Sequence, residues 1–214
     1  MTSQAGASRI FPGPPPHGAG QRIGLYGGSF NPPHEGHRHV SLLALRRLSL
    51  DRIWWVVTPG NPLKDVGGLP PLEERMARAA AVARSPRIAV TGMEAAIGTR
   101  YTADLVAWLA ARFPLTRFVW VMGSDNLRQL DRWERYDTIV ETMPVAVVNR
   151  PGTLTAALSA RAAQKYARAR IPEAASHVLA DLVPPAWVFL NGPRTPVSST
   201  ALRAAATPDR TSAS

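Results

Sequence analysis

The sequence predicts an α/β fold: a doubly wound, Rossmann-like parallel sheet of about five to six strands, flanked by helices. Short apolar runs alternate along the chain with longer segments whose apolar residues recur at helical spacing. Several of these runs are continuous, as in strands that a parallel sheet buries on both faces. With 214 residues, 45% of them hydrophobic, the chain can form one sizeable core.

Each expected strand is an apolar run that ends at glycine, proline or polar residues. The strands are expected at 22–28, 52–59, 87–92, 117–123, 144–150 and 186–192. Apolar residues with a 3.6-residue period predict the helices, and Leu105, Leu109 and Phe113 share one helical face. The helices are expected at 36–50, 72–84 and 101–113, as one or two helices within 123–141, and near 155–169.

The two ends of the chain differ in composition from the middle. Residues 1–21 are rich in Pro, Gly and Ser and contain no long apolar run, so we expect a disordered tail and no secretory signal. Residues 22–206 are expected to form a single domain, and 207–214 a flexible tail. No run is long enough to cross a bilayer, which makes the cytoplasm the default location. The chain has no cysteine, which excludes disulfides and thiolate nucleophiles.

The formal charge of +10 favours anionic partners such as nucleotides, nucleic acid or phosphorylated metabolites. A composition that serves solubility explains the same charge equally well. The basic residues are spread out, with no block of five or six, so we expect no dedicated nucleic-acid arm and no nucleic-acid partner. The sequence indicates no oligomeric state.

The segment GGSFNPPHEGHRHV, residues 27–40, contains the first candidate site. Gly27 and Gly28 end a strand, where a missing side chain lets the backbone approach a ligand. His34 is expected just outside the following helix and His37 in its first turn, so both rings can face an anion at the helix N-terminus. A turn whose histidines only cap the helix is the alternative. A zinc site needs a third ligand, and His39 points elsewhere on the helix, so no metal ligand is predicted.

A second candidate anion site lies near the C-terminus. Ser198, Ser199 and Thr200 stand at an expected helix start, and Arg203 follows one turn later. Hydroxyls and free amides at such a start bind phosphate oxygens, although Ser and Thr there are usually only caps. The two clusters follow the first and last main strands. In a doubly wound sheet, they can face the same polyphosphate at the point where strand order reverses.

Together, G-G-S-F-N-P-P-H-x-G-H and the distal S-S-T-x-x-R resemble the nucleotidyltransferases of the HIGH superfamily, and closely the nicotinate-nucleotide adenylyltransferases. The resemblance covers about residues 22–206. Further matches are Lys64 in a Pro-Leu-Lys segment, the pair Arg75-Met76, the segment Tyr101-Thr102-Ala103-Asp104, and Gly123-Ser124-Asp125 with Trp133 eight residues after the aspartate. Two positions depart from the family pattern. Leu63 replaces the usual histidine before Lys64, and Arg100 replaces the common serine before Tyr101.

The resemblance implies that AMP is transferred from ATP to nicotinate mononucleotide, with Mg²⁺ bridging phosphate oxygens. His37 would then meet the α-phosphate and His34 the triphosphate. Thr200 and Arg203, with Ser199, would hold the β- and γ-phosphates. The remaining implied ATP contacts are Gly27, Gly28, Ser29, Phe30, Gly123, Asp125 and Ser198, among which Asp125 would accept from ribose hydroxyls.

The resemblance also implies a site for the acceptor. Trp133 would stack on the pyridine ring, Tyr101 and Thr102 would lie near its carboxylate, and Lys64 would attract the mononucleotide phosphate. Each has a structural alternative: a tryptophan packed between helices, a helix cap at Thr102 and a solvated loop lysine. Two other functions stay open. One is a superfamily enzyme whose acceptor is nicotinamide mononucleotide or pantetheine phosphate; the other is a non-catalytic nucleotide- or RNA-binding module.

Overall fold

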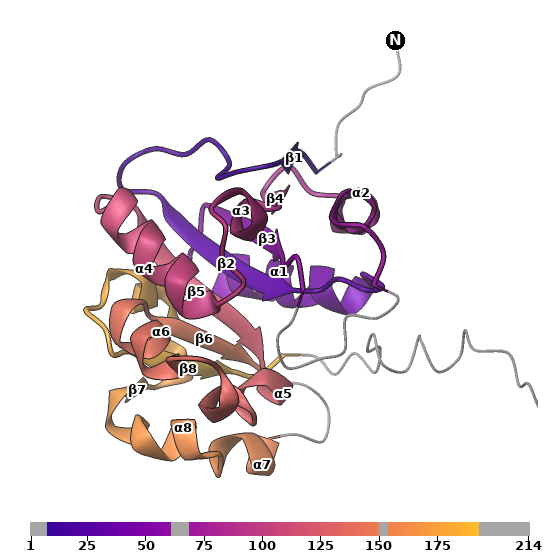
Figure 1. Ribbon diagram of the computed structural model, residues 1–214. Helices are drawn as coiled ribbons and strands as arrows, with labels where there is room; N and C mark the ends of the chain where they lie inside the picture. The colour runs from indigo at the N-terminus through magenta and orange to yellow at the C-terminus, as the bar shows by residue number, and fades with distance from the viewer. Residues whose placement is uncertain (1–7, 61–68, 150–153, 193–214) are drawn as a thin grey trace, which may run out of the picture.

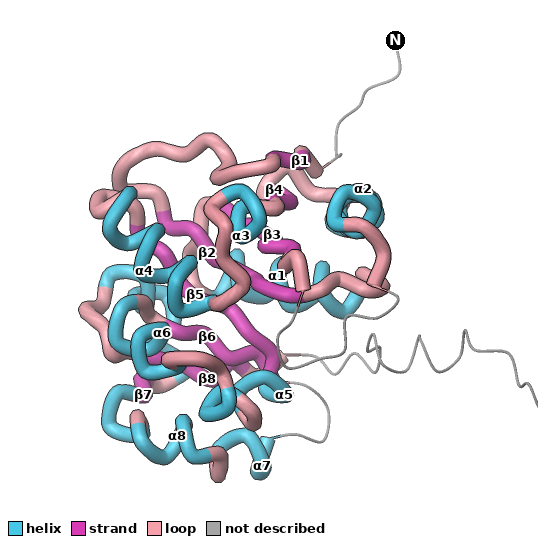
Figure 2. Tube along the Cα trace, in the orientation of Figure 1, coloured by secondary structure: helices cyan, strands magenta, loops and turns pink. Residues whose placement is uncertain are grey.

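The computed structural model describes residues 8–60, 69–149 and 154–192, and in them a parallel sheet lies between two layers of helices (Figures 1 and 2). Eight strands join in the order β1-β4-β3-β2-β5-β6-β8-β7, and every pairing is parallel. The fold class predicted from the sequence is thus confirmed.

The strands are β1 (Ile10–Phe11), β2 (Arg22–Gly28), β3 (Arg52–Val57), β4 (Ile88–Thr91), β5 (Arg117–Gly123), β6 (Val145–Val148), β7 (Arg170–Ile171) and β8 (Trp187–Leu190). The α-helices are α1 (Glu35–Arg47), α2 (Leu72–Ala83), α3 (Met93–Ala96), α4 (Thr102–Arg112), α5 (Ser124–Leu127), α6 (Tyr136–Thr142), α7 (Leu154–Leu158) and α8 (Arg161–Lys165). Three 3₁₀ helices complete the described part: η1 (Leu130–Arg132), η2 (Ala167–Ala169) and η3 (Glu173–Asp181).

All six expected strands are present, and the sheet is wider than predicted because it gains one two-residue strand at each edge. β1 pairs with β4, and β7 pairs with β8. The expectation that residues 1–21 form a disordered tail is therefore wrong for residues 8–21. Backbone hydrogen bonds from Val90 N to Arg9 O and from Gly92 N to Phe11 O attach this segment to the sheet edge. The His17 ring also packs edge-on against Trp54 and Phe113.

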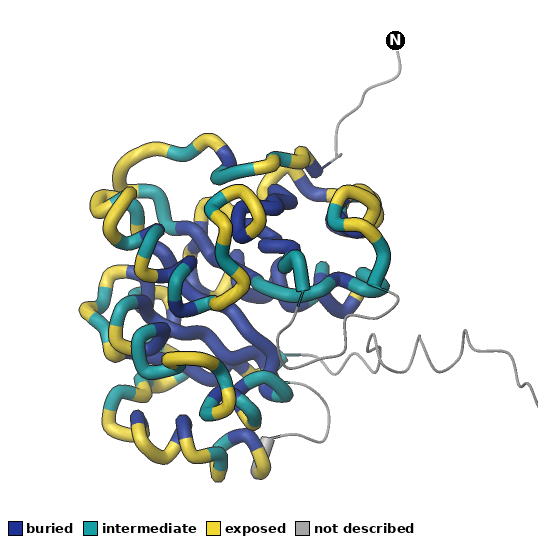
Figure 3. The backbone as a smooth tube through the Cα atoms, in the orientation of Figure 1, coloured by how far each residue is buried: buried dark blue, intermediate teal, exposed yellow. Residues whose placement is uncertain are grey.

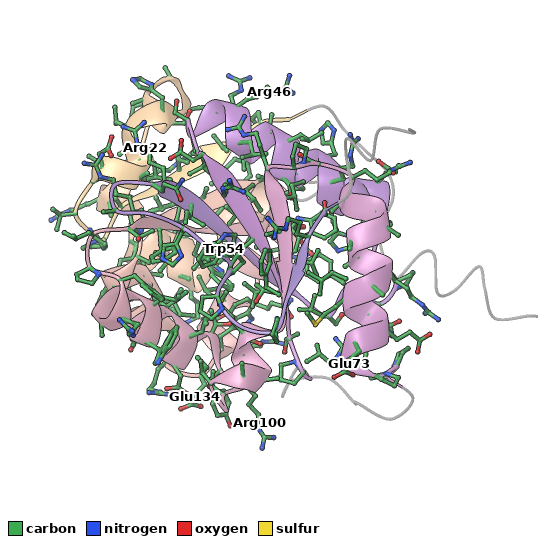
Figure 4. The ribbon with its side chains drawn as sticks, turned by 90° about the horizontal axis from the view of Figure 1, so that it is seen from above. Arg22, Arg46, Trp54, Glu73, Arg100 and Glu134 are labelled. Atoms are coloured by element: carbon green, nitrogen blue, oxygen red, sulfur yellow. The ribbon has the colours of Figure 1, made fainter. Side chains whose placement is uncertain are left out.

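The sheet separates two apolar cores, and Figure 3 shows its strands as the buried centre of the molecule. One core lies between the sheet and α1, α2 and η3, the other between the sheet and α4, α5, α6 and α8. In β3, Trp54 faces the second core and Trp55 the first, as expected for successive residues of a strand. Figure 4, in which Trp54 is labelled, shows it at the centre of the sheet. No helix in the described residues is both long and apolar enough to span a membrane.

Strand order reverses between β2 and β5. From β2 the chain proceeds outward through β3 to β4, and from β5 it proceeds the other way through β6 to β8. At such a reversal the connections leave in opposite directions, so a crevice can form beyond the carboxyl ends of the two strands. Gly28 ends β2 and Gly123 ends β5, so the two glycine-containing motifs singled out in the sequence flank this point.

Candidate active site

The two histidines cap the start of α1 through each other. His34 is the N-cap residue, and its Nδ1 accepts a hydrogen bond from Gly36 N at 3.1 Å. Three residues on, His37 Nδ1 accepts from His34 N, also at 3.1 Å. This is a reciprocal capping box built from imidazoles, so both histidines cap the helix.

The capping bonds determine the tautomer of both rings. A nitrogen that accepts from a backbone N–H carries no proton, so each neutral ring holds its hydrogen on Nε2. Protonating Nδ1 would set a donor against a donor and break the cap. The ring centroids of His34 and His37 lie 3.9 Å apart. Capping and anion binding are therefore compatible, because one nitrogen of each ring serves the helix and the other is a donor suited to a phosphate oxygen.

Contacts with buried residues hold the His37 ring in place. The side chains of His34 and His37 are 5% and 8% exposed. Phe30 lies 4.9 Å from His37 between ring centroids and stacks on Trp55 at the same distance. The Trp55 indole donates to Ser41 Oγ at 2.7 Å, and Ser41 Oγ donates to His37 O at 2.9 Å. Phe30, expected as an ATP contact, is 1% exposed, and its ring packs against His37 and Trp55.

Gly27 has a packing requirement in addition to the expected approach to a ligand. A Cβ atom at this position would lie 2.6 Å from Cη2 of Trp120, a residue of the neighbouring strand β5. At Gly28 a Cβ would lie 3.5 Å from Phe30, an ordinary contact. The absence of a side chain at Gly27 therefore lets the Trp120 ring fill the junction between β2 and β5.

Arg75 joins the ends of β2 and β3, a role that sequence reasoning did not assign. Its side chain is 1% exposed. The guanidinium donates to Ser29 O at 3.0 Å, Thr58 O at 2.7 Å and Pro59 O at 3.3 Å. Nε donates to Pro70 O at 2.9 Å. Burial lowers the pKa of this guanidinium, and the charge of Glu73 acts in the opposite direction. The Arg-Met pair noted in the sequence was the available signal.

Glu94 is a buried acid at the carboxyl end of the neighbouring strand, and it was also missed. It is 3% exposed and stands in α3, directly beyond β4. Burial raises the pKa of this carboxyl to about 7, while a hydrogen bond with the Thr58 side chain acts in the opposite direction. The Thr58 hydroxyl donates to Gly60 O at 2.9 Å. Because a hydroxyl has one hydrogen, a protonated Glu94 can donate to Thr58 while an ionised one competes with Gly60 for that hydrogen.

Asp125 stands where the motif placed it, across the reversal point from the histidines. It lies in the first turn of α5, which begins directly after Gly123. The N-cap residue of α5 is Gly123, so Asp125 is not the residue that caps this helix. A carboxylate in the first turn is favourably placed for the helix dipole.

The residues expected at the acceptor lie on two neighbouring segments. Tyr101, 37% exposed, is the N-cap residue of α4 and makes no side-chain capping bond, and Thr102 is the first residue of that helix. Thr102 is therefore not the N-cap of α4. Trp133 is half-buried between η1 and α6, edge-on to Trp120 with ring centroids 6.5 Å apart. Trp133 thus packs against the core and keeps part of its surface accessible.

The remaining predicted site residues lie outside the described residues. They are Lys64, Ser198, Ser199, Thr200 and Arg203. The departure at Leu63 lies outside as well, and Arg100 stands in the loop before α4.

Comparisons with known proteins agree with this architecture. A family model described as "Cytidylyltransferase-like" matches residues 25–205. A "Probable nicotinate-nucleotide adenylyltransferase" of Methylorubrum extorquens is 63% identical over 85% of this chain and 98% of its own length. Proteins of the same name from Bradyrhizobium sp. and Brucella abortus are 56% and 52% identical over 85% of this chain, covering 95% and 93% of their own lengths.

A solved structure shares the fold. It is described as Plasmodium falciparum nicotinic acid mononucleotide adenylyltransferase complexed with NaAD, and it matches with a TM-score of 0.63 and 18% identity over 88% of this chain and 85% of its own. This likeness supports the fold, whereas membership of the family rests on the bacterial relatives. The chain belongs to the cytidylyltransferase-like family and, within it, to the nicotinate-nucleotide adenylyltransferases.

Proposed function

We propose that this protein transfers AMP from ATP to nicotinate mononucleotide, giving nicotinate adenine dinucleotide and pyrophosphate. The observation that carries the proposal is the pair of imidazoles at the start of α1, at the point where strand order reverses. Each imidazole caps the helix by accepting a backbone hydrogen bond at Nδ1. Full-length relatives bearing the name of this activity support it.

The reaction is an in-line displacement at phosphorus. A phosphate oxygen of nicotinate mononucleotide bonds to the α-phosphorus of ATP, and the bond from that phosphorus to the bridging oxygen of pyrophosphate breaks. No protein nucleophile takes part, so the chain contributes positioning and charge stabilisation. The Nε2–H of His37 would donate to the α-phosphate, and that of His34 to the triphosphate. A correctly placed donor of this kind is typically worth about 2–4 kcal/mol of transition-state stabilisation.

The remaining contacts follow the family pattern. Ser199, Thr200 and Arg203, with Ser198, would hold the leaving pyrophosphate. Asp125 would accept from ribose hydroxyls, and Gly27, Gly28, Ser29 and Gly123 would let the backbone approach the nucleotide. On the acceptor side, Trp133 would stack on the pyridine ring, with Tyr101 and Thr102 near its carboxylate and Lys64 near the phosphate.

Mg²⁺ would accompany ATP and neutralise charge on its phosphates. This ion usually keeps several waters and binds through phosphates and one or two carboxylates. Within residues 8–60, 69–149 and 154–192, no three His, Cys, Asp or Glu side chains gather into a possible metal site. The described residues therefore suit a cation held mainly by substrate phosphates and water. A chelator should abolish turnover, and added Mg²⁺ should restore it.

The test is pyrophosphate release from ATP with nicotinate or nicotinamide mononucleotide as acceptor. We expect release with the nicotinate compound and its loss in His37→Ala. Equal release with both acceptors would retain the chemistry and refute the roles of Tyr101, Thr102 and Trp133 at the ring carboxylate. No release with either would point to another acceptor, such as pantetheine phosphate, or to a non-catalytic nucleotide-binding module.

A further inference from the structure

The acceptor side of the proposed site consists of two segments from different parts of the chain. Tyr101 and Thr102 start α4, beyond β4, whereas Trp133 precedes α6, beyond β5. α4 and α6 pack side by side over the same face of the sheet (Figure 1). In Figure 4 the labels of Arg100 and Glu134, which flank the two segments, both stand at the lower edge of the view. A contact that joins the segments would set the width of the acceptor site.

Asp104 makes such a contact with each of its carboxylate oxygens. Oδ1 accepts a hydrogen bond from Arg135 Nη2 at 2.6 Å, and Arg135 belongs to the segment that carries Trp133. Oδ2 accepts from Thr99 Oγ1 at 3.0 Å, and Thr99 Oγ1 in turn accepts from Tyr101 N at 3.1 Å, which reaches the other segment. One side chain therefore bridges the two walls expected around the pyridine ring, and Asp104 has no role in the proposed chemistry.

The backbone at Arg135 gives an independent reason why this bridge matters. Arg135 has φ 48° and ψ 45°, the left-handed region that residues other than glycine rarely adopt. It is the N-cap residue of α6, and Tyr136 N donates to Trp133 O at 3.2 Å in the same turn. The turn that carries Trp133 is thus strained, and Asp104 holds its arginine in place.

The charges at this contact agree with the geometry. The hydrogen bond from Arg135 lowers the pKa of Asp104, with smaller contributions from the Thr99 bond and the arginine charge. The bond and the charge of Asp104 raise the pKa of Arg135, and Glu134 and Tyr101 add to this effect. The hydrogen bonds to Asp104 therefore connect both walls of the acceptor site to one ion pair.

We propose that Asp104 is a positioning residue that holds Tyr101 and Trp133 at the spacing required for the nicotinate ring. The inference rests on the proposed function. Asp104 touches no substrate in this role and acts through Arg135 and Thr99. Because the pair is about half exposed, the effect is modest and falls on acceptor binding alone.

The test is steady-state kinetics of Asp104→Asn, which removes the charge and retains the shape. We expect KM for nicotinate mononucleotide to rise about three- to tenfold, with kcat and KM for ATP unchanged. The matched control is Asp181→Asn. Asp181 also accepts from two arginines, Arg22 and Arg117, but at the amino ends of β2 and β5, far from the crevice. It should leave all three constants unchanged.

A double-mutant cycle separates the bridge from a general effect on folding. If the ion pair is the agent, Arg135→Gln should raise the same KM, and the double variant should be no worse than either single one. Arg135→Gly, which relieves the backbone strain and loses the side chain, should raise KM without lowering the melting temperature. An unchanged KM for nicotinate mononucleotide in Asp104→Asn would overturn the inference. A variant with lower kcat, higher KM for both substrates and lower stability would overturn it as well. If the wild-type protein releases no pyrophosphate from ATP, the proposed function itself is overturned, so the two failures are distinguishable.

Discussion

Replacing Glu94 by glutamine should change how the stability of this protein depends on pH. The carboxyl is 3% exposed, lies beyond β4 and contacts the Thr58 hydroxyl. Its pKa rises from an ordinary value of 4.5 to about 7, chiefly because burial disfavours the charged form. Glutamine has nearly the same shape, stays neutral at every pH and can still donate to the hydroxyl. The substitution therefore removes the titration and preserves the packing.

The size of the effect follows from the two pKa values. The folded state holds the proton more tightly than the unfolded state, so the stability contributed by Glu94 is complete below pH 4.5 and is lost as pH rises through 7. A difference of 7 minus 4.5 corresponds to about 3 kcal/mol at 1.36 kcal/mol per pKa unit. About 2–3 kcal/mol of that loss falls between pH 5 and pH 8.5. The glutamine variant escapes this loss.

The assay is urea unfolding of both proteins at pH 5 and pH 8.5. We expect the free energy of unfolding of the variant minus that of wild type to be about 2–3 kcal/mol larger at pH 8.5 than at pH 5. Any constant cost of the amide cancels in this difference. Glu74→Gln is the control, because its side chain is 46% exposed on α2 and its effect should be small at either pH. The same Glu94 difference at both pH values, or its reverse, would refute the reasoning.

Five further substitutions test the rest of the site. Gly27→Ala should lower the free energy of unfolding by about 1–3 kcal/mol, because the new Cβ would meet the Trp120 ring, while Gly28→Ala should be nearly neutral; equal stabilities in urea would contradict this. Arg75→Met should cost about 3 kcal/mol or more and lower the melting temperature, because four carbonyls lose a donor, and a melting temperature equal to wild type would show those bonds to be dispensable. His37→Ala and His37→Asn should both lower kcat by about 10²–10³-fold. Only the alanine should lose about 1 kcal/mol of stability, because asparagine keeps an acceptor for the cap, so a kcat retained by asparagine would refute the Nε2 role.

The central strands could be predicted because their residue types indicate burial on both faces of the sheet. RIGLYGG and RFVWVMG are continuous apolar runs, and both strands have the predicted bounds. The edge strands gave no such signal. β1 has two residues, and backbone bonds to β4 hold it, so almost any sequence can form it. The proline-rich segment around it therefore suggested disorder, although His17 packs between Trp54 and Phe113.

Motif residues of the site could be placed from sequence, whereas the groups that hold them could not. Helix-start chemistry put His34 and His37 at the N-terminus of α1, where the structure has them. Arginine and glutamate usually lie at the surface, so nothing local in the sequence indicates that Glu94 is buried, and for Arg75 the Arg-Met pair was the one signal. Asp104 belongs to a segment matched in the sequence, but its bridging role is recognisable only when the distant Arg135 is known to lie beside it.

The strand order has a consequence for how the molecule assembles. β1-β4-β3-β2 comes from one continuous stretch of chain and β5-β6-β8-β7 from the next, and among the described strands only β2 with β5 joins the two groups. The two stretches can therefore acquire structure separately, with the crevice forming only when they dock. A nucleotide bound across that seam favours the docked state, by about 2.7 kcal/mol at a hundred times its Kd. Substrate binding would thus stabilise the docked arrangement of the two stretches.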